Sequence, residues 1–317
     1  MKILLIKPSS LGDVVQSLPV LCNLRRHFPK AQIDWLVFKP YGDLLEDHLD
    51  IDHILSIRKP RLSLQLWKED LLPLKAWFQK TSYDVTIDLQ GLLRSGILTM
   101  LSGAKRKIGL ASAREGAQLF YNETVQDTAT QAALRYLQVL DHLKIPYDPL
   151  LFHLEVGVPL PPLLEGVKDY FVFHPYTRWK TKLWPWRHYQ KLARSLAPQP
   201  CVLVGNGPYF PCEGENVIDL RQGLDLRTTM SVLKNAQGVV STDSGPAHLA
   251  AALGVRTISL FGATDPLKTA PIGREAYFIQ GKVPCAPCLK RVCQNHIQMA
   301  CMKEISISNI MHELLLK

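Results

Sequence analysis

The chain has 317 residues, of which 47% are hydrophobic and 21% are charged, and this length suits two α/β domains of about 150 residues each. No apolar run approaches the roughly 18 residues of a membrane-spanning helix, and the short apolar run at the N-terminus has no signal-peptide cleavage site after it. The formal charge of +9 favours anionic partners, but no nucleic-acid recognition motif accompanies it, so we expect no nucleic-acid partner.

Short apolar runs alternate with segments of helical period from the first residues onward, which is typical of parallel sheets covered by helices. The first series predicts strands at residues 3–6, 33–38, 52–55 and 83–89, and helices at residues 15–25, 92–101 and 131–143. A proline-rich stretch at residues 147–164 predicts a connection. The second series predicts strands at residues 171–174, 201–204, 217–220, 238–241 and 257–261, and helices at residues 186–196, 226–235, 246–253 and 308–316.

A polar motif follows the first predicted strand, where Ser10, Gly12 and Asp13 precede the first helix. Ligands of open α/β sheets bind at the carboxyl ends of the strands. Gly12 allows close approach of a ligand, and the Asp13 carboxylate is a candidate general base. A plain helix cap is the simpler interpretation, because Ser and Asp are favoured N-cap residues. The three-glycine pattern of a dinucleotide site is absent, which counts against an oxidoreductase.

The most specific motif spans residues 241–251, where a predicted strand ends in Thr242, Asp243, Ser244 and Gly245 and a proline begins a helix. A helix N-terminus offers free N–H groups and partial positive charge, so the motif predicts a phosphate site. A capped helix without a ligand is the alternative, but a cap needs only one such residue. His248 falls in the first helical turn.

A basic loop follows the first strand of the second series and contains Arg178, Lys180 and Lys182. These cations suit a diphosphate leaving group, because arginine offers a bidentate fork and lysine a point charge. A solvated basic loop is the alternative, which the nearby tryptophans disfavour.

Together these motifs resemble glycosyltransferase family 9, the heptosyltransferases of lipopolysaccharide core assembly, and residues 113–122 are most similar to the heptosyltransferase I subgroup. The segments that carry the resemblance are residues 6–14, 87–95, 181–185, 241–249 and 261–266. The resemblance implies an α/β fold of GT-B type, with two facing Rossmann-like domains built on parallel sheets. Residues 1–158 would bind the acceptor and residues 159–317 the nucleotide sugar.

The resemblance also implies chemistry and residue roles. Asp13 is implied to deprotonate an acceptor hydroxyl that attacks ADP-heptose with inversion, and no cofactor is required. The implied donor-binding residues are Thr177, Arg178, Lys182, Thr242, Asp243, Ser244, Gly245, His248 and Thr264. The implied residues for an anionic glycolipid acceptor of the Kdo-lipid A type are Ser10, Gly12, Arg58, Lys59, Arg61, Gln90 and Arg114. Such an acceptor implies a cytoplasmic protein, peripheral on the inner membrane.

Three positions depart from the family pattern, since Pro8, Ala263 and Gln131 stand where Thr, Pro and His are common. Residues 62–78 suit either a helix at a membrane interface or a core-facing helix interrupted at Pro73. Two alternative functions stay open: a family 9-like transferase with another nucleotide-sugar donor, and a non-catalytic sugar-nucleotide-binding protein.

Four of the seven cysteines, Cys285, Cys288, Cys293 and Cys301, lie close together in sequence. A C-x-x-C pair followed by two further thiols suits a tetrahedral structural site for zinc or iron. Free buried thiols, or a disulfide formed during handling, are the alternatives. The odd number of cysteines favours a reducing compartment.

Overall fold

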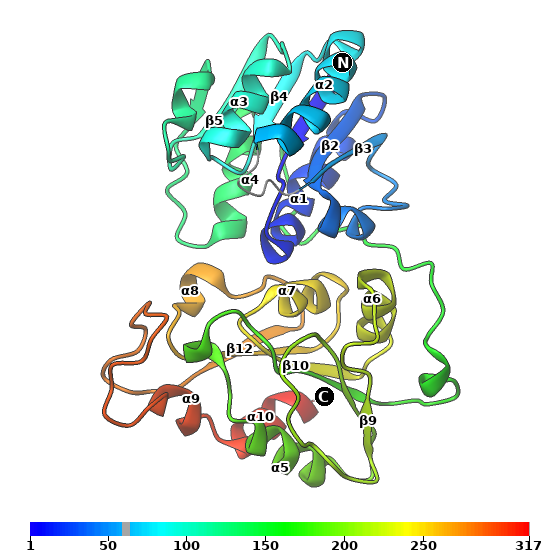
Figure 1. Ribbon diagram of the computed structural model, residues 1–317, viewed down its shortest axis with the longest axis vertical. Coiled ribbons are helices and arrows are strands. Elements are labelled where there is room, and N and C mark those ends of the chain that lie inside the picture. The colour runs from blue at the N-terminus through cyan, green and yellow to red at the C-terminus, as the bar shows by residue number, and fades with distance from the viewer. Residues whose placement is uncertain (59–63, 317) are drawn as a thin grey trace. The chain divides into compact units, whose positions relative to one another are not determined.

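The computed structural model describes residues 1–58 and 64–316. The chain divides into two compact units, Met1–Glu155 and Val156–Lys317 (Figure 1). The predicted domain boundary, between residues 158 and 159, lies in the same connection, whose residues 151–161 form neither helix nor strand. No described helix combines the length and the apolar character needed to cross a membrane.

Unit 1 is built on a six-stranded parallel sheet with the strand order β3-β2-β1-β4-β5-β6. Its strands are β1 (Lys2–Ile6), β2 (Gln32–Phe38), β3 (His53–Ile57), β4 (Val85–Asp88), β5 (Arg106–Leu110) and β6 (Glu123–Val125). Its α-helices are α1 (Leu11–His27), α2 (Leu64–Thr81), α3 (Leu93–Leu101) and α4 (Ala132–His142), with 3-10 turns η1 (Lys39–Leu44) and η2 (Ala117–Phe120).

The strand order in unit 1 reverses between β1 and β4, which is where ligands bind in sheets of this kind. In the register of these two strands Ile6 lies opposite Asp88, so the loops that follow both strands start side by side. Residues 3–6 are buried because helices cover both faces of a parallel sheet.

The expected break at Pro73 is wrong, because α2 continues through this residue and buries Leu74 and Phe78 in the core. Proline removes the N–H that would bond the Glu69 carbonyl. Both Pro73 and Glu69 are exposed, so water can satisfy that carbonyl. The helix therefore continues past Pro73, because the carbonyl that loses its helical partner faces solvent.

Unit 2 repeats the topology of unit 1, with the strand order β12-β11-β10-β7-β8-β9. Its strands are β7 (Phe171–His174), β8 (Cys201–Leu203), β9 (Val217–Asp219), β10 (Gly238–Thr242), β11 (Thr257–Phe261) and β12 (Ala276–Gln280). Its helices are α5 (Trp186–Leu196), α6 (Leu226–Lys234), α7 (Gly245–Ala252), α8 (Pro266–Thr269), α9 (Ala300–Glu304) and α10 (Ile307–Leu315), with 3-10 turns η3 (Pro162–Leu164) and η4 (Lys180–Lys182). The order reverses between β7 and β10.

Candidate catalytic and donor-binding sites

Asp13 lies in the first turn of α1, directly after the loop that leaves β1. One carboxylate oxygen, Oδ2, accepts hydrogen bonds from the Ser10 backbone N–H at 3.0 Å and from the Ser10 hydroxyl at 2.6 Å. The other, Oδ1, accepts a 3.1 Å hydrogen bond from the Tyr136 hydroxyl on α4. Asp13 therefore helps to cap α1, as the simpler interpretation expected, and is also held from a second helix.

Lys7 and Tyr136 complete this arrangement, and neither was given a role from the sequence. Lys7 is 3% exposed, and its ammonium group donates to the Leu89 carbonyl at 2.8 Å and to the Tyr136 hydroxyl at 2.9 Å. The same ammonium lies 4.4 Å from the centroid of the Tyr136 ring. A lysine directly after a fully buried strand was the available signal, because a buried charge needs nearby partners.

The protonation states in this cluster follow from burial and mutual charge. Burial alone raises the pKa of Asp13, but the charge of Lys7 and the hydrogen bonds from Ser10 and Tyr136 outweigh it, so the pKa lies below its ordinary value. Burial lowers the pKa of Lys7 against the opposing charges of Asp13 and Asp88. Burial and the Asp13 charge raise the pKa of Tyr136 well above its ordinary value. Asp13 is thus an ionised acceptor and Tyr136 a protonated donor.

A cavity of about 440 Å³ in unit 1 opens onto Asp13. Its lining includes the predicted residues Asp13, Gln90 and Arg114, together with the unpredicted residues Lys7, Ser112, Asp127, Arg135 and Tyr136. The Nε atom of Arg135 is buried and has no hydrogen-bond partner among the described residues. The mixture of guanidinium, hydroxyl and carboxylate groups suits a polar, anionic ligand.

The end of β4 shapes the cavity wall that carries Gln90. The buried Asp88 carboxylate accepts the backbone N–H groups of Gln90 at 2.8 Å and Gly91 at 3.1 Å. Gly91 has a φ of +66°, which favours glycine in this turn. The Gln90 side chain in turn accepts the Ser9 backbone N–H at 3.2 Å, which ties the loops after β1 and β4 together.

The remaining predicted acceptor residues are placed differently. Arg58 forms ion pairs with Glu69 at 2.7 Å and with Asp70 at 3.3 Å, both on α2. It is not among the residues lining the Asp13 cavity. Lys59 and Arg61 lie outside the described residues. Gly12 is buried in the first turn of α1, and Arg114 is exposed at the cavity.

In unit 2, three loops converge on the Asp243 carboxylate after β10. Lys182 forms a 2.6 Å ion pair with Asp243 Oδ2, and the Thr264 hydroxyl donates to the same oxygen at 2.6 Å. The Thr177 hydroxyl donates to the Asp243 carbonyl at 3.4 Å. The structure therefore brings four of the predicted donor residues into contact, from the loops after β7, β10 and β11.

Ser244 precedes α7 but does not cap it with its side chain. Its hydroxyl instead lies 3.2 Å from Nδ1 of His174, and the Ser241 hydroxyl lies 3.4 Å from the same atom. The strand register places Ser241 opposite His174. Burial lowers the pKa of His174 to about 4, so its imidazole is neutral at pH 7. The imidazole beside the α7 N-terminus is thus uncharged.

Four other predicted donor residues complete this surface. The Thr242 hydroxyl donates to the Tyr176 carbonyl at 3.0 Å. Gly245 is the first residue of α7, and His248 is buried in its first turn. Arg178 is exposed, and its guanidinium has no hydrogen bond or ion pair with the described residues. Arg178 therefore keeps its charge available.

The four clustered cysteines are free thiols that range from exposed Cys285 to buried Cys301. Burial raises the pKa of Cys301, and the charges of the other three thiols add to this. Among the described residues, the one group that brings three or more metal-ligand atoms close together is Cys22, His48 and Asp50, so the four clustered cysteines are not drawn together as a ligand set in this structure. Backbone N–H groups of Met299 and Asn295 lower the pKa of Cys293. No disulfide joins the described cysteines, and a thiol that accepts N–H hydrogen bonds suits a thiolate ligand.

A second group of metal-ligand types lies in unit 1, where ligand atoms of Cys22, His48 and Asp50 are within 4.8 Å of one another. Both ring nitrogens of His48 are engaged, Nδ1 by the Asp50 N–H at 3.2 Å and Nε2 by the Phe152 carbonyl at 3.1 Å. Burial raises the pKa of Cys22 far above its ordinary value, which keeps the thiol protonated. This group is a satisfied core cluster.

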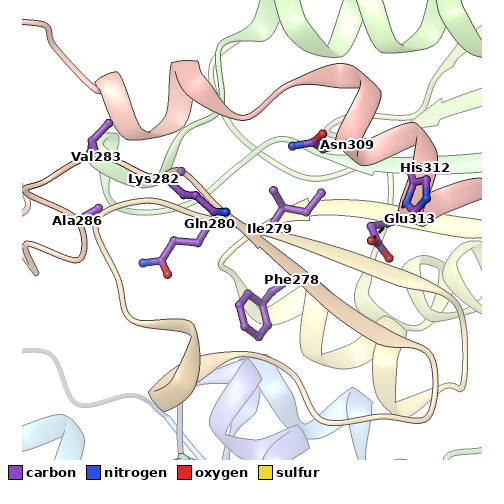
Figure 2. A pocket seen from close by; sticks show the side chains of 10 residues that line it. Phe278, Ile279, Gln280, Lys282, Val283, Ala286, Asn309, His312 and Glu313 are labelled. Atoms are coloured by element: carbon purple, nitrogen blue, oxygen red, sulfur yellow. Dashed lines mark ion pairs between the residues drawn. The ribbon is translucent and has the colours of Figure 1, made fainter.

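A larger cavity, about 550 Å³, lies in unit 2 between β12 and α10. Figure 2 shows Phe278, Ile279 and Gln280 from the strand and Asn309, His312 and Glu313 from the helix around it. None of the predicted site residues lines it, so size alone does not identify the donor site.

Two Rossmann-type domains, each with polar loops at the reversal of its strand order, have the architecture expected of a GT-B glycosyltransferase, and solved heptosyltransferase structures share this fold. The chain belongs to glycosyltransferase family 9 (heptosyltransferase), whose family model matches residues 74–298. The predicted family, enzyme class and GT-B fold are thereby confirmed.

Named relatives agree with this assignment. Lipopolysaccharide heptosyltransferase 1 of Pseudomonas aeruginosa is 33% identical to this chain, covering 92% of it and 87% of the relative. The Escherichia coli K12 protein of the same name is 28% identical, covering 84% and 89%. The solved structure of E. coli heptosyltransferase WaaC with ADP has a TM-score of 0.74 at 24% identity and covers 98% of both chains. The predicted similarity to the heptosyltransferase I subgroup is confirmed.

Proposed function

We propose that this chain transfers heptose from ADP-heptose to an anionic inner-core acceptor of the Kdo-lipid A type, with inversion at the anomeric carbon. The observation that carries the proposal is the Asp13 carboxylate, which is held by Ser10 and Tyr136 and opens onto a cavity containing arginines. The names of the relatives supply the sugar and the acceptor class.

Asp13 acts as the general base in this reaction. It accepts the proton of the acceptor hydroxyl while that oxygen forms a bond to the anomeric carbon, and the bond from this carbon to ADP breaks. A depressed pKa makes Asp13 a weak base. The proton therefore moves as the new carbon–oxygen bond forms, when the hydroxyl has become more acidic.

The leaving diphosphate is stabilised by fixed positive charge. Lys182 supplies an ammonium, Arg178 supplies an unpaired guanidinium, and the N-terminus of α7 supplies backbone N–H groups. Thr177, Thr242, Ser244 and Thr264 are the hydroxyl residues assigned to this site, while Gly245 lets the ligand approach the backbone. His248 and Asp243 complete the proposed donor site.

The acceptor is held by the first domain. Arg114 and Arg135 at the Asp13 cavity suit carboxylate groups, and Gln90 lines the same cavity. Ser10 and Gly12 lie next to Asp13 at the start of α1, where we assign them to the acceptor as well. Arg58, Lys59 and Arg61 are assigned to a more distant anionic part of the glycolipid. A glycolipid acceptor places the protein at the cytoplasmic face of the inner membrane.

Parallel calorimetric titrations with ADP, UDP, GDP and NAD test the donor. Selective ADP binding is expected. A preference for UDP or GDP would indicate a different nucleotide-sugar donor. Binding of NAD alone would contradict the proposed transferase activity.

A turnover assay tests the base. Asp13→Asn is expected to abolish heptose transfer while leaving ADP affinity unchanged, because the substitution removes the base but no donor contact. Full turnover by this variant would refute the assigned base. Loss of ADP binding together with turnover would instead indicate a damaged fold.

We also infer that Cys285, Cys288, Cys293 and Cys301 hold one structural zinc or iron ion. The support is the C-x-x-C pair followed by two further thiols, all four of which are free in the structure. Elemental analysis of protein purified without chelator is expected to find about one metal ion per chain. Replacement of all four cysteines by serine should remove it, and metal-free wild-type protein would contradict the site.

A further inference from the structure

Residues 282–299, here called the cysteine segment, are attached to two of the three loops that carry donor residues, those after β7 and β11. The backbone N–H of Leu289 donates to the Ala263 carbonyl at 2.7 Å, next to Thr264. The Thr181 hydroxyl donates to the Lys290 carbonyl at 2.7 Å, next to Lys182. The segment is therefore part of the surround of the proposed donor site rather than a separate appendage.

Arg291 follows these two attachment points directly. Its guanidinium carbon lies 5.1 Å from the centroid of the Trp179 ring. The Lys182 ammonium lies 4.8 Å from the same centroid. Trp179 thus holds two cations from different segments against one aromatic ring, and one of them is the lysine assigned to the leaving group.

The two cations differ in their partners. Lys182 is compensated by Asp243 at 2.6 Å. Arg291 is exposed and forms no ion pair with a described carboxylate. An arginine that stacks on a tryptophan keeps its N–H fork free for a bidentate acceptor. Arg291 is therefore the less compensated charge of the pair.

We propose that the cysteine segment forms one wall of the donor site and supplies Arg291 as a further cation for the diphosphate of the nucleotide. This inference rests on the proposed transferase function. A nucleoside diphosphate carries more negative charge than Lys182 can neutralise while that residue remains paired with Asp243. Phosphate oxygens also match the planar guanidinium fork.

Calorimetric titration of the full-length protein with ADP tests the proposal. Arg291→Gln is expected to weaken binding about tenfold, in the range of one lost charge-assisted pair. Arg291→Lys should recover part of the loss, because it restores the charge without the fork. The dependence of affinity on salt concentration should be shallower in Arg291→Gln than in the wild type.

Lys282→Gln is the matched control. Lys282 belongs to the same segment but lines the cavity between β12 and α10, as Figure 2 shows. Its substitution should leave ADP affinity unchanged. Equal ADP affinity in Arg291→Gln and the wild type overturns the proposal. Weakening by Lys282→Gln instead of Arg291→Gln overturns it as well, and assigns the nucleotide to that cavity.

The outcome also separates this inference from the proposed function. If the wild type prefers UDP or GDP, the assignment of ADP-heptose as the donor is wrong. Arg291→Gln is then still expected to lower the affinity for whichever nucleoside diphosphate binds. If the wild type binds no nucleoside diphosphate, both proposals fail.

Discussion

The Tyr136 hydroxyl links Lys7 to Asp13, accepting a 2.9 Å hydrogen bond from the first and donating one of 3.1 Å to the second. A buried ammonium therefore acts on the proposed base through one hydroxyl as well as through its charge. The arrangement keeps Asp13 ionised and fixes the direction of one carboxylate oxygen.

Lys7→Met is expected to move the acid limb of the kcat–pH profile to higher pH by about one unit. The reason is that the Lys7 charge lowers the pKa of Asp13, so its removal raises that pKa. The ionised base is then lost sooner as pH falls. ADP affinity should stay unchanged. Steady-state kinetics extended below pH 4, as far as the folded protein allows, measure the limb, because the wild-type pKa of Asp13 lies below its ordinary value.

Two further variants sharpen this test. Lys2→Met is the control, because Lys2 lies at the opposite end of β1 and its ammonium donates to the Thr81 carbonyl at 2.7 Å. Tyr136→Phe should shift the limb in the same direction by less, since it removes the link but not the charge. Identical limbs in Lys7→Met and Lys2→Met would rule out the electrostatic role of Lys7.

Arg135→Gln is expected to raise the KM for the acceptor about tenfold with ADP affinity unchanged, in line with one charge-assisted hydrogen bond. Its buried Nε has no partner among the described residues and lies at the Asp13 cavity. Arg106→Gln is the control, because Arg106 is engaged by Glu123 at 2.6 Å. Equal acceptor KM values in both variants would exclude Arg135 from acceptor binding.

Lys182→Met is expected to lower the free energy of unfolding of unit 2 by about 3 kcal/mol, because it leaves the buried Asp243 carboxylate without its ion-pair partner. The double variant Lys182→Met/Asp243→Asn should regain most of this stability. It should not regain ADP affinity, because the ammonium is still missing. Thermal unfolding and calorimetry distinguish the two effects, and recovery of both would mean that Lys182 only pairs with Asp243.

The stability of unit 2 is expected to fall as pH decreases from 6.5 to about 4. Unfolded histidine gains a proton near its ordinary pKa of 6.5, whereas burial keeps folded His174 neutral until about 4. The unfolded state binds more protons between these two pH values, which lowers the free energy of unfolding by up to about 3 kcal/mol. Urea unfolding of the wild type and of His174→Gln across this pH range measures how the stability of each protein depends on pH. An equal pH dependence in the two proteins would show that His174 is not the group responsible.

Sequence patterns recovered the buried parts of the fold because parallel strands are continuous apolar runs. They missed β5, β6 and β12: β5 and β6 lack continuous apolar runs, and β12 is only partly buried. The residues of the Asp243 cluster were predicted through the family resemblance, and they lie in loops that follow strands recovered from the sequence pattern. Contacts such as Lys7 with Tyr136, 129 positions apart, depend on the strand order and were not predictable. The same holds for Arg58 and its partners on α2.

Both units place their polar loops at the reversal point of the same strand order. If the acceptor binds to unit 1 and the donor to unit 2, as proposed, the residues that touch each ligand sit on loops whose supporting sheet belongs to one unit alone. Substitutions in the loops after β10 and β11 leave the first sheet unchanged, and those after β1 and β4 leave the second unchanged. Under this proposed assignment, recombination within the connection would exchange one substrate preference while the other is inherited intact, so that donor and acceptor choice could diverge at separate rates.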